Sequence, residues 1–332
     1  MAAPQKRSTL VDVARLAGVS AKTVSRVYSE PDKVGQPTKA KVLAAAERLL
    51  FKPNALAREL RMGGNTGLLA YITPELTNPF FIQVAAGVER ECAANGLTMA
   101  LSASDSVERE LEVIDAMLAG RARCVLLVPL GDDYSFLEGE RRLGTAIVAI
   151  DRLARNLLAD SVVLANREGG YLATKKLIEA GHRSIGFVCS PVAIFTQQLR
   201  LEGYRQALRE ARLSIDSRWE SVSDDPEVTM ESLVERVIDA RVTAIVGGNN
   251  RATTSILRVF GQRGIELGLV GFDDFDIADF HGVSVVAHDP GEMGRVAVQL
   301  ALRRLQDPTG HTEHVELPVR YIARGSGERA PG

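Results

Sequence analysis

The sequence predicts an α/β fold, with an all-α helix-turn-helix domain at the N-terminus and a two-lobed core of parallel sheets flanked by helices. Three observations support this prediction. Residues 8–27 have the pattern of two short capped helices, and a basic head is joined to an acidic body. From residue 66 onward, short apolar runs alternate with longer amphipathic segments, which is typical of parallel sheets. A chain of 332 residues is also too long for one small domain.

The first two helices are indicated by their caps and by the turn between them. Thr9 can cap the first helix, and Asp12 three residues later completes a capping box. Gly18 follows the last apolar turn, where a helix end favours a residue that adopts positive φ. Ser20 can then cap the second helix. The residues expected to face inward are Val13, Leu16 and Ala17 in the first helix and Val24 and Val27 in the second.

The outer face of the second helix suits contact with DNA. It carries small and cationic side chains, namely Ala21, Lys22, Ser25 and Arg26. Such a face at a helix N-terminus fits the major groove. Two capped helices joined by a glycine turn also occur in many helix bundles, so this pattern alone leaves a purely structural role open.

The distribution of charge favours nucleic-acid binding by the head. The whole chain has a formal net charge of −2. Residues 1–61 contain 12 Lys/Arg and 5 Asp/Glu, whereas the remainder contains 28 basic and 37 acidic residues. A basic domain on an acidic body is typical of a DNA-binding domain joined to a unit with another task, although a merely solvated basic surface would give the same counts.

Two further segments complete the head and join it to the core. Residues 38–50 are expected to form a third helix that ends before Pro53, since the residue before a proline avoids helical geometry. Its inward side chains would be Val42, Leu43, Ala46, Leu49 and Leu50. Residues 54–61 have the composition of a helix too short to be stable alone in water. We therefore expect a domain over residues 1–53, a short helix and linker over 54–65, and a core over 66–332.

The core is predicted to consist of two similar lobes. Apolar runs lie at residues 68–72, 97–101, 124–128, 146–150, 185–188, 244–246 and 267–272, and amphipathic segments at 80–94, 107–118, 167–180, 197–211 and 253–263. Alternating strands and helices of this kind form parallel sheets with helices on both faces. So many units exceed one small sheet, and we expect the lobes to divide near residues 163–166.

Polar and aromatic side chains follow several of these strands. They are Phe80, Phe81, Asp151, Arg152, Arg200, Asn249 and Asp273. Ligands of parallel sheets bind at the carboxyl ends of the strands. Carboxylates, amides and guanidinium groups bind hydroxyls, and aromatic rings pack on the C–H face of a sugar, so the set suits a polyhydroxylated ligand. Taken singly, each residue has a local explanation, such as a loop ion pair, a turn former or core packing.

Little in the sequence predicts catalysis, a metal site or a cofactor. The histidines at 182, 281, 288, 311 and 314 lack metal-ligand spacing, and no nucleophile elbow, P-loop or dinucleotide-binding motif follows a strand. An α/β hydrolase or dehydrogenase is therefore the weaker alternative. Cys92, Cys124 and Cys189 lie far apart in the sequence, each within an apolar run, so we expect buried free thiols. Free thiols are typical of a reducing cytoplasm.

A cytoplasmic protein is also expected from the hydropathy of the chain. The N-terminal residues lack the apolar stretch of a signal peptide, and no apolar run is long enough for a membrane helix. Both observations disfavour a sugar-binding component of a transport system.

Seven motifs in combination make the chain resemble the lactose/galactose repressor (LacI/GalR) family of bacterial transcription regulators. They lie at residues 12–27, 51–61, 77–81, 180–188, 201–208, 270–274 and 292–300. The resemblance implies a homodimer whose two heads bind a pseudo-palindromic, double-stranded DNA operator. The DNA-contacting residues it implies are Thr9, Ser20, Ala21, Lys22, Thr23, Ser25 and Arg26 in the head and Asn54, Ala57 and Leu60 in the hinge. Leu60 matches a leucine that inserts into the central base step from the minor groove and kinks the duplex. The alternative is that Leu60 is simply an exposed leucine of the linker.

The core resembles periplasmic sugar-binding proteins. This implies an N-lobe of residues 66–165 and 291–318 and a C-lobe of residues 166–290 and 319–328. The seven strand-end residues and His288 match ligand-binding positions, and the set is especially similar to ribose-binding proteins. We therefore expect ribose, a related pentose or a nucleoside-derived ribose to act as effector and release the DNA. Two alternatives remain. The effector could act as a corepressor that strengthens DNA binding, or the chain could be a sugar-binding protein without a regulatory role.

The chain departs from the family pattern at four places. Asn250 replaces a usual Asp, His288 stands where Gln is common, and Gly35 replaces a common serine cap before the third helix. Residues 223–226 stand where an aromatic side chain is frequent. All but the substitution at Gly35 bear on the identity of the effector.

Overall fold

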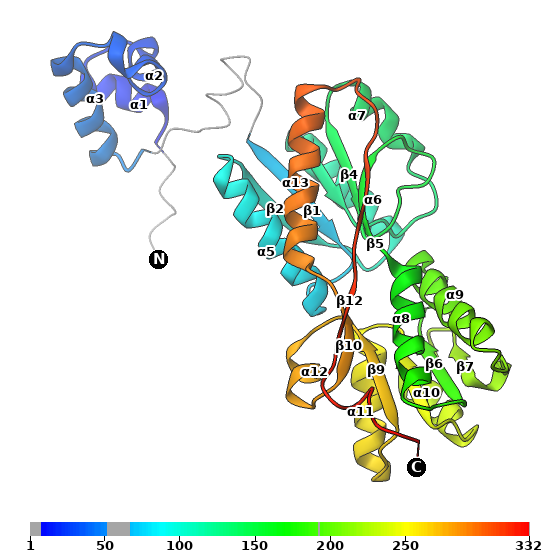
Figure 1. The fold of residues 1–332 in the computed structure, drawn as a ribbon. Helices are drawn as coiled ribbons and strands as arrows, with labels where there is room; N and C mark the ends of the chain where they lie inside the picture. The colour runs from blue at the N-terminus through cyan, green and yellow to red at the C-terminus, as the bar shows by residue number, and fades with distance from the viewer. Residues whose placement is uncertain (1–7, 52–66, 192, 332) are drawn as a thin grey trace. The chain divides into compact units, whose positions relative to one another are not determined.

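The computed structural model describes residues 8–51, 67–191 and 193–331, and the chain forms two compact units, Met1–Gly67 and Leu68–Gly332 (Figure 1). The expected roles of Asn54, Ala57 and Leu60, and the expected hinge over residues 54–65, lie outside the described residues.

The first unit contains the predicted helix-turn-helix. Its helices are α1 (Leu10–Ala17), α2 (Ala21–Ser29) and α3 (Gln36–Arg48), with a short 3-10 turn at Pro31–Lys33. The capping box is present, because Thr9 accepts from the backbone N–H of Asp12 and the Asp12 carboxylate accepts from that of Thr9. Gly18 ends α1 with φ of 66°, and Ser20 caps α2. The caps and the turn are therefore confirmed.

The core of this unit is built from smaller side chains than expected. Val13, Val24, Val27 and Val42 are buried with Ala14, Ala45 and Ala46. Leu16, Leu43 and Leu50 were expected to face inward but are 44%, 43% and 89% exposed. Helices this short pack closely around alanine and valine, and the leucines are left at the margin of the apolar stripe. Helix α3 begins at Gln36 rather than residue 38, and Gly35 gives it no side-chain cap.

The second unit has two lobes, each with one six-stranded sheet, which confirms the predicted core. The N-lobe sheet has the order β11-β5-β4-β3-β1-β2, and its paired strands are all parallel. Its strands are β1 (Leu68–Thr73), β2 (Thr98–Ala103), β3 (Cys124–Leu127), β4 (Ala146–Ile150), β5 (Asp160–Leu164) and β11 (His314–Leu317). Its helices are α5 (Pro79–Ala94), α6 (Val107–Ala119), α7 (Glu138–Arg142) and α13 (Pro290–Gln306).

The C-lobe repeats this arrangement with the order β12-β10-β9-β8-β6-β7. Its strands are β6 (Ile185–Cys189), β7 (Glu220–Val222), β8 (Ala244–Gly247), β9 (Gly268–Phe272), β10 (Ser284–Ala287) and β12 (Arg320–Ile322), the last antiparallel to β10. Its helices are α8 (Asn166–Glu179), α9 (Phe195–Glu210), α10 (Met230–Asp239), α11 (Asn250–Arg263) and α12 (Asp276–Phe280).

The central strands of each sheet are buried on both faces, which is why they read as continuous apolar runs, whereas the edge strands β2, β11 and β12 are only partly buried. In the N-lobe, α5 and α13 cover one face and α6 the other; in the C-lobe, α10 and α11 cover one face and α8 and α9 the other. Cys92, Cys124 and Cys189 are buried free thiols, as expected. The chain passes between the lobes at residues 164–166, 287–290 and 317–320, so three adjacent segments connect them (Figure 1).

Helices α8 and α9 approach closely because a glycine on each helix faces the backbone of the other helix. A Cβ atom on Gly170 would lie 2.0 Å from the carbonyl oxygen of Arg200, and one on Gly203 would lie 2.0 Å from that of Arg167. Any larger residue would push the helices apart. The crossing therefore fixes the backbone that carries Arg200, one of the predicted ligand-binding residues.

We expect Gly170→Ala to lower the free energy of unfolding of the C-lobe by about 1–3 kcal/mol or more, because the added methyl group overpacks this crossing. Urea unfolding followed by the fluorescence of Trp219, the single tryptophan, measures this change. Gly261→Ala on α11 is the matched control, since no atom lies within 4 Å of the added Cβ. It should instead stabilise the helix by about 0.5–1 kcal/mol. Equal effects of the two substitutions would contradict the proposed crossing constraint.

Candidate functional site

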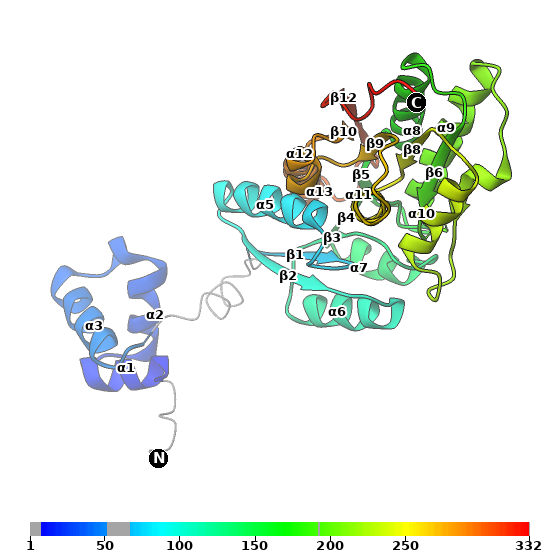
Figure 2. The same cartoon turned by 90° about the horizontal axis from the view of Figure 1, so that it is seen from below.

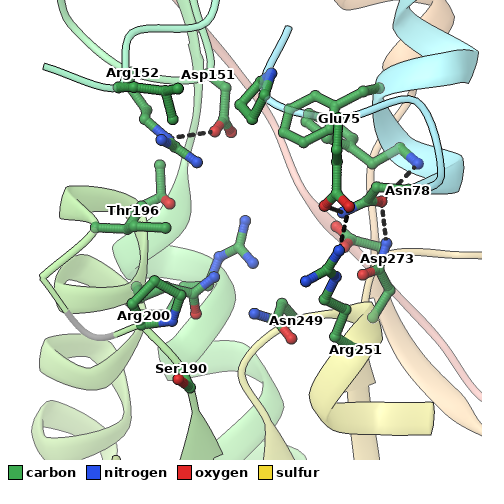
Figure 3. A pocket seen from close by; sticks show the side chains of 18 of the residues that line it. Glu75, Asn78, Asp151, Arg152, Ser190, Thr196, Arg200, Asn249, Arg251 and Asp273 are labelled. Carbon is green, nitrogen blue, oxygen red and sulfur yellow. Dashed lines mark hydrogen bonds and ion pairs between the residues drawn. The ribbon is translucent and has the colours of Figure 1, made fainter. Parts of the chain in front are cut away.

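A cleft of about 380 Å³ lies between the two lobes of the second unit (Figure 3). Both lobes contribute to its walls. Seven of the residues singled out in the sequence line it: Phe80, Phe81, Asp151 and Arg152 from the N-lobe, and Arg200, Asn249 and Asp273 from the C-lobe. The structure therefore brings these residues together at the strand ends, and their contact with a ligand remains a prediction.

Two aspartates occupy equivalent positions in the lobes. Asp151 follows β4 and Asp273 follows β9, and their side chains face the cleft (Figure 3). Both residues have left-handed backbone, with φ of 66° and 70°, which is uncommon outside glycine. Both are also buried. Buried carboxylates on strained backbone are concentrated at functional sites, because strain persists only where the surrounding structure imposes it.

Arg200 is held rigidly beside them. It is 4% exposed, and its Nε donates to Asn166 Oδ1 and its Nη1 to the carbonyl oxygen of Gly248, both at 2.8 Å. Its guanidinium carbon lies 3.5 Å from the centre of the Phe272 ring. A stacked and doubly hydrogen-bonded guanidinium keeps one orientation, which suits recognition of hydroxyl oxygens.

The pKa values of Asp151 and Asp273 are shifted in opposite directions. Burial raises the pKa of the Asp151 carboxyl, and the charges of Arg152 and Arg200 only partly offset it. Burial also acts to raise the pKa of Asp273, but a hydrogen bond from His288 and the charge of Arg200 outweigh it, so that pKa is lowered. Burial lowers the pKa of the Arg200 guanidinium. Asp273 is thus a ready hydrogen-bond acceptor, whereas the neighbours of Asp151 stabilise its charged form less well.

His288 supports the site from behind and is absent from the residues that line the cleft. Its Nε2 lies 2.9 Å from Asp273 Oδ1, and its ring meets that of Phe80 edge-on with centroids 5.3 Å apart. It therefore connects an aspartate of the C-lobe to an aromatic side chain of the N-lobe. The sequence placed His288 among the ligand-binding residues, and the structure gives it contact with the cleft through Asp273 and Phe80, which line it.

Two pairs of side chains join the lobes at one edge of the cleft. Asn250 Nδ2 donates to Asn78 Oδ1 at 2.7 Å, and Arg251 forms an ion pair with Glu75 (Figure 3). In the sequence, Asn250 stood out only as a departure from the family pattern. The Asn250 amide can donate a hydrogen bond to Asn78, whereas the carboxylate of the usual aspartate could not. The asparagine at this position therefore helps to join the two lobes.

Asn78 and Asn249 also cap the helices that flank the cleft. Asn78 accepts from the backbone N–H of Phe80 at the start of α5, and Asn249 accepts from that of Ala252 at the start of α11. Asn249 therefore has a local structural role as a helix cap. Its amide nitrogen is not used by the cap and faces the cleft as a donor (Figure 3).

Further polar residues of the cleft were not predicted from the sequence. Thr196 and Gln197 line it from the first turn of α9, one turn before Arg200, and this spacing was the signal that could have found them. Gln197 Oε1 and Arg152 Nε are buried without a hydrogen-bond partner among the described residues. Unsatisfied buried polar atoms destabilise a protein unless a water molecule or a ligand satisfies them.

The head presents the predicted outer face of α2. Ala21, Lys22 and Arg26 are exposed, whereas Thr23 and Ser25 are half-buried. The remaining predicted residues make local caps: Ser20 accepts from the backbone N–H of Thr23, and the Thr9 hydroxyl bonds the Asp12 carboxylate at 2.6 Å. Lys22 and Arg26 therefore have the reach and charge to contact DNA, and Thr9, Ser20 and Thr23 chiefly shape the helix ends.

Two kinds of feature are absent from the described part of the chain. It holds no cluster of three or more His, Cys, Asp or Glu side chains that could hold a metal ion. None of the helices in residues 8–51 or 67–331 that the structure describes is long and apolar enough to cross a membrane.

Both units resemble known protein families. Residues 9–54 match the family described as bacterial regulatory proteins, lacI family, and residues 174–327 match a periplasmic binding protein-like domain. The chain is 30% identical over 336 residues to the ribose operon repressor of Escherichia coli, with 96% of this chain and 99% of the relative covered. It is 30% identical over 332 residues to the HTH-type transcriptional repressor PurR of Photobacterium profundum, covering 96% and 98%.

A solved structure shares the fold over nearly the whole chain. The lac repressor dimer bound to operator and the anti-inducer ONPF superimposes with a TM-score of 0.82, at 23% identity, covering 98% of this chain and all of that one.

We expect Asp151→Asn to stabilise the ligand-free core at neutral pH, because it removes a buried carboxylate whose pKa is raised by burial. The folded-state pKa lies above the ordinary value of 3.8, so the wild-type protein gains stability as the pH falls through that pKa. The advantage of the variant should therefore shrink in acid. Urea unfolding followed by circular dichroism at neutral and acid pH measures it.

Asp133→Asn is the control for this prediction. Asp133 is exposed, and hydrogen bonds from Ser135 and Asn156 lower its pKa. Its replacement should have the opposite sign, a loss of stability at neutral pH that disappears in acid. A destabilised Asp151→Asn core at neutral pH would show that Asp151 contributes to folding rather than to binding.

Proposed function

Because the chain belongs to the lacI family of bacterial regulatory proteins, whose members are transcriptional regulators and not enzymes, we propose that it represses transcription from a palindromic operator and is released by a small sugar-like effector. The operator would be bound by the helix-turn-helix units of a homodimer, and the effector by the cleft between the lobes. The proposal implies a cytoplasmic protein, because its DNA partner lies there.

The observation that carries this proposal is the set of buried polar groups that face the cleft from both lobes. Asp151 and Arg152 belong to one lobe, and Arg200 and Asp273 to the other. A ligand that satisfies both sets makes its full contacts only when the lobes are closed around it, so binding favours that arrangement. A change of lobe angle is then available to alter the spacing of the two heads of a dimer.

The chemistry of the cleft supports an uncharged, polyhydroxylated effector. Its carboxylates are accompanied by guanidinium groups, so neither sign of charge is in large excess. Phe80 and Phe81 supply adjacent aromatic rings, with centroids 5.0 Å apart. Ribose or a related pentose is our first candidate, supported by the similarity of the chain to a ribose operon repressor.

An exposed apolar face supports a homodimer. Ile82 on α5 is 42% exposed, and Ile277 and Phe280 on α12 are 45% and 86% exposed. Both helices lie along the same edge of the second unit in two views (Figures 1 and 2). A two-fold contact between copies of this face would remove these side chains from water. The hinge residues Asn54, Ala57 and Leu60 remain part of the proposal for DNA contact.

We predict that Lys22→Ala weakens binding to the specific operator about tenfold or more, because it removes a cation from the face of α2 that meets the DNA. An operator selected from random duplexes and fluorescence anisotropy provide the measurement. Lys41→Ala on α3 is matched in charge and is also exposed. It should leave the affinity nearly unchanged, and an equal loss in both variants would contradict a recognition role for α2.

Asp273→Asn should leave operator affinity intact but raise the effector concentration needed for release about tenfold or more, since hydrogen bonds to charged groups are each worth about 1.5–3 kcal/mol. Release of labelled operator by a panel of sugars measures the response. Asp274→Asn is the control, because the Asp274 carboxylate pairs with Arg324 instead of lining the cleft. A normal response of Asp273→Asn would place the effector elsewhere.

A further inference from the structure

A buried glutamate lies behind the N-lobe wall of the cleft without lining it. Glu110 in α6 is 1% exposed and is not among the residues that line the cleft. The other buried residues of this helix face, Val113 and Ile114, are apolar. Burial raises the pKa of the Glu110 carboxyl, and hydrogen bonds from Tyr134 and Leu130 only partly offset that effect. A carboxylate in such surroundings destabilises the fold unless its partners compensate for the lost hydration.

The hydrogen-bond partners of Glu110 lie in the segment that follows β3. The backbone N–H of Leu130 donates to Oε1 at 3.1 Å, and the hydroxyl of Tyr134, itself 1% exposed, donates to Oε2. The backbone N–H of Gly131 donates to the Tyr134 hydroxyl oxygen at 2.8 Å. We call residues 129–134 the β3 loop. Glu110 thus fixes this loop from behind, directly and through Tyr134.

The β3 loop in turn holds Arg152. The carbonyl oxygen of Pro129 accepts from Arg152 Nη1 at 3.1 Å, and the next residue, Leu130, lines the cleft. Arg152 Nε lies 3.4 Å from Asp151 Oδ2 and makes no hydrogen bond within the described residues (Figure 3). The charge of Arg152 acts to lower the pKa of both Glu110 and Asp151. Two buried carboxylates therefore balance this guanidinium.

We propose that Glu110 is a positioning residue of the effector site, which acts through the β3 loop to hold Arg152 in the orientation that leaves Nε free for a ligand. The inference rests on the proposed function, since it gives Arg152 a ligand to contact. The bond to Pro129 engages Nη1 and keeps the guanidinium from turning further towards Asp151. A released guanidinium can form a two-bond pair with that carboxylate, and an effector would then have to break the pair before it could bind either group.

The chemistry of the loop contacts requires a carboxylate at position 110. An ionised carboxylate has two acceptor oxygens and no donor, which matches the two donors that it meets. Glutamine has the same shape but would turn an N–H towards Tyr134, whose oxygen already accepts from Gly131. The Tyr134 hydroxyl hydrogen would then lack an acceptor. Glu110→Gln therefore loosens the β3 loop while leaving the volume of the side chain nearly unchanged.

The first test observes Arg152 directly in the ligand-free full chain. NMR relaxation of the arginine Nε–H groups in protein labelled with ¹⁵N-arginine reports how rigidly each guanidinium is held, and loss of one signal in Arg152→Lys assigns that of Arg152. We expect an order parameter of about 0.85 for Arg152 in the wild-type protein and below about 0.6 in Glu110→Gln. The Nε–H of Arg200, which donates to Asn166 in the C-lobe, is the internal reference and should not change.

Two further variants separate positioning from a general loss of stability. Glu220→Gln is the matched control, because the Glu220 side chain is 10% exposed and pairs with Arg205 in the C-lobe. It should destabilise the protein without changing the Arg152 signal. Tyr134→Phe removes one hydrogen bond to Glu110 but keeps the carboxylate and its bond to the β3 loop. It should give an intermediate order parameter for Arg152, and it decides the question should Glu110→Gln fail to fold.

The second test measures binding of D-ribose by calorimetry. Glu110→Gln should weaken ribose binding about fivefold or more in the wild-type background, the effect of about one hydrogen bond, and have little further effect in the Arg152→Lys background.

Two results would overturn the inference. An Arg152 signal that stays rigid in both Glu110→Gln and Tyr134→Phe would show that Glu110 only braces the fold. An equal loss of ribose affinity with and without Arg152 would show that Glu110 acts by another route. Failure of ribose to bind the wild-type protein would instead overturn ribose as the effector, and the NMR measurement would still decide the role of Glu110.

Discussion

The interaction on which the second unit depends is the meeting of buried charges from two lobes. Asp151 stands on one side of the cleft, and Arg200 and Asp273 stand on the other. Burial makes the charge of Asp151 costly despite the neighbouring Arg152 and Arg200, whereas Asp273 is stabilised within its own lobe by His288 and Arg200. The glycine crossing of α8 and α9, the stack of Arg200 on Phe272 and the left-handed backbone of both aspartates hold these groups in place. The free energy of lobe closure therefore depends on what lies between them.

This dependence gives a physical route from a small molecule to DNA. Three adjacent segments join the lobes, at residues 164–166, 287–290 and 317–320. Because the lobes are connected only there among the described residues, the angle between them can change. Cross-lobe pairs such as Asn250 with Asn78 favour closure modestly on their own. A ligand adds to this preference by bonding Gln197 Oε1 and Arg152 Nε, which are buried without a hydrogen-bond partner within the described residues. If a ligand in the cleft changes the affinity for the operator, the operator must change the affinity for that ligand by the same factor.

Much of this arrangement was accessible from the sequence. Strand-end positions such as Asp151, Asn249 and Asp273 could be predicted because parallel strands bring their carboxyl ends to one edge. The helix-turn-helix was equally accessible, since caps such as Thr9 and Gly18 act locally. The cross-lobe pair of Asn78 and Asn250 was not, because it depends on how two separately folded lobes face each other. Short strands such as β11 and β12 also carry too few residues for a recognisable period, and His288 acts through Asp273 in a way no spacing reveals.

The most direct test of the account is a double titration on the full chain. The affinity for a selected operator is measured without effector and at saturating effector, and the affinity for effector is measured without and with operator. The account predicts that effector weakens operator binding at least about fivefold and that operator weakens effector binding by the same factor. An operator affinity that stays unchanged at saturating effector would contradict it.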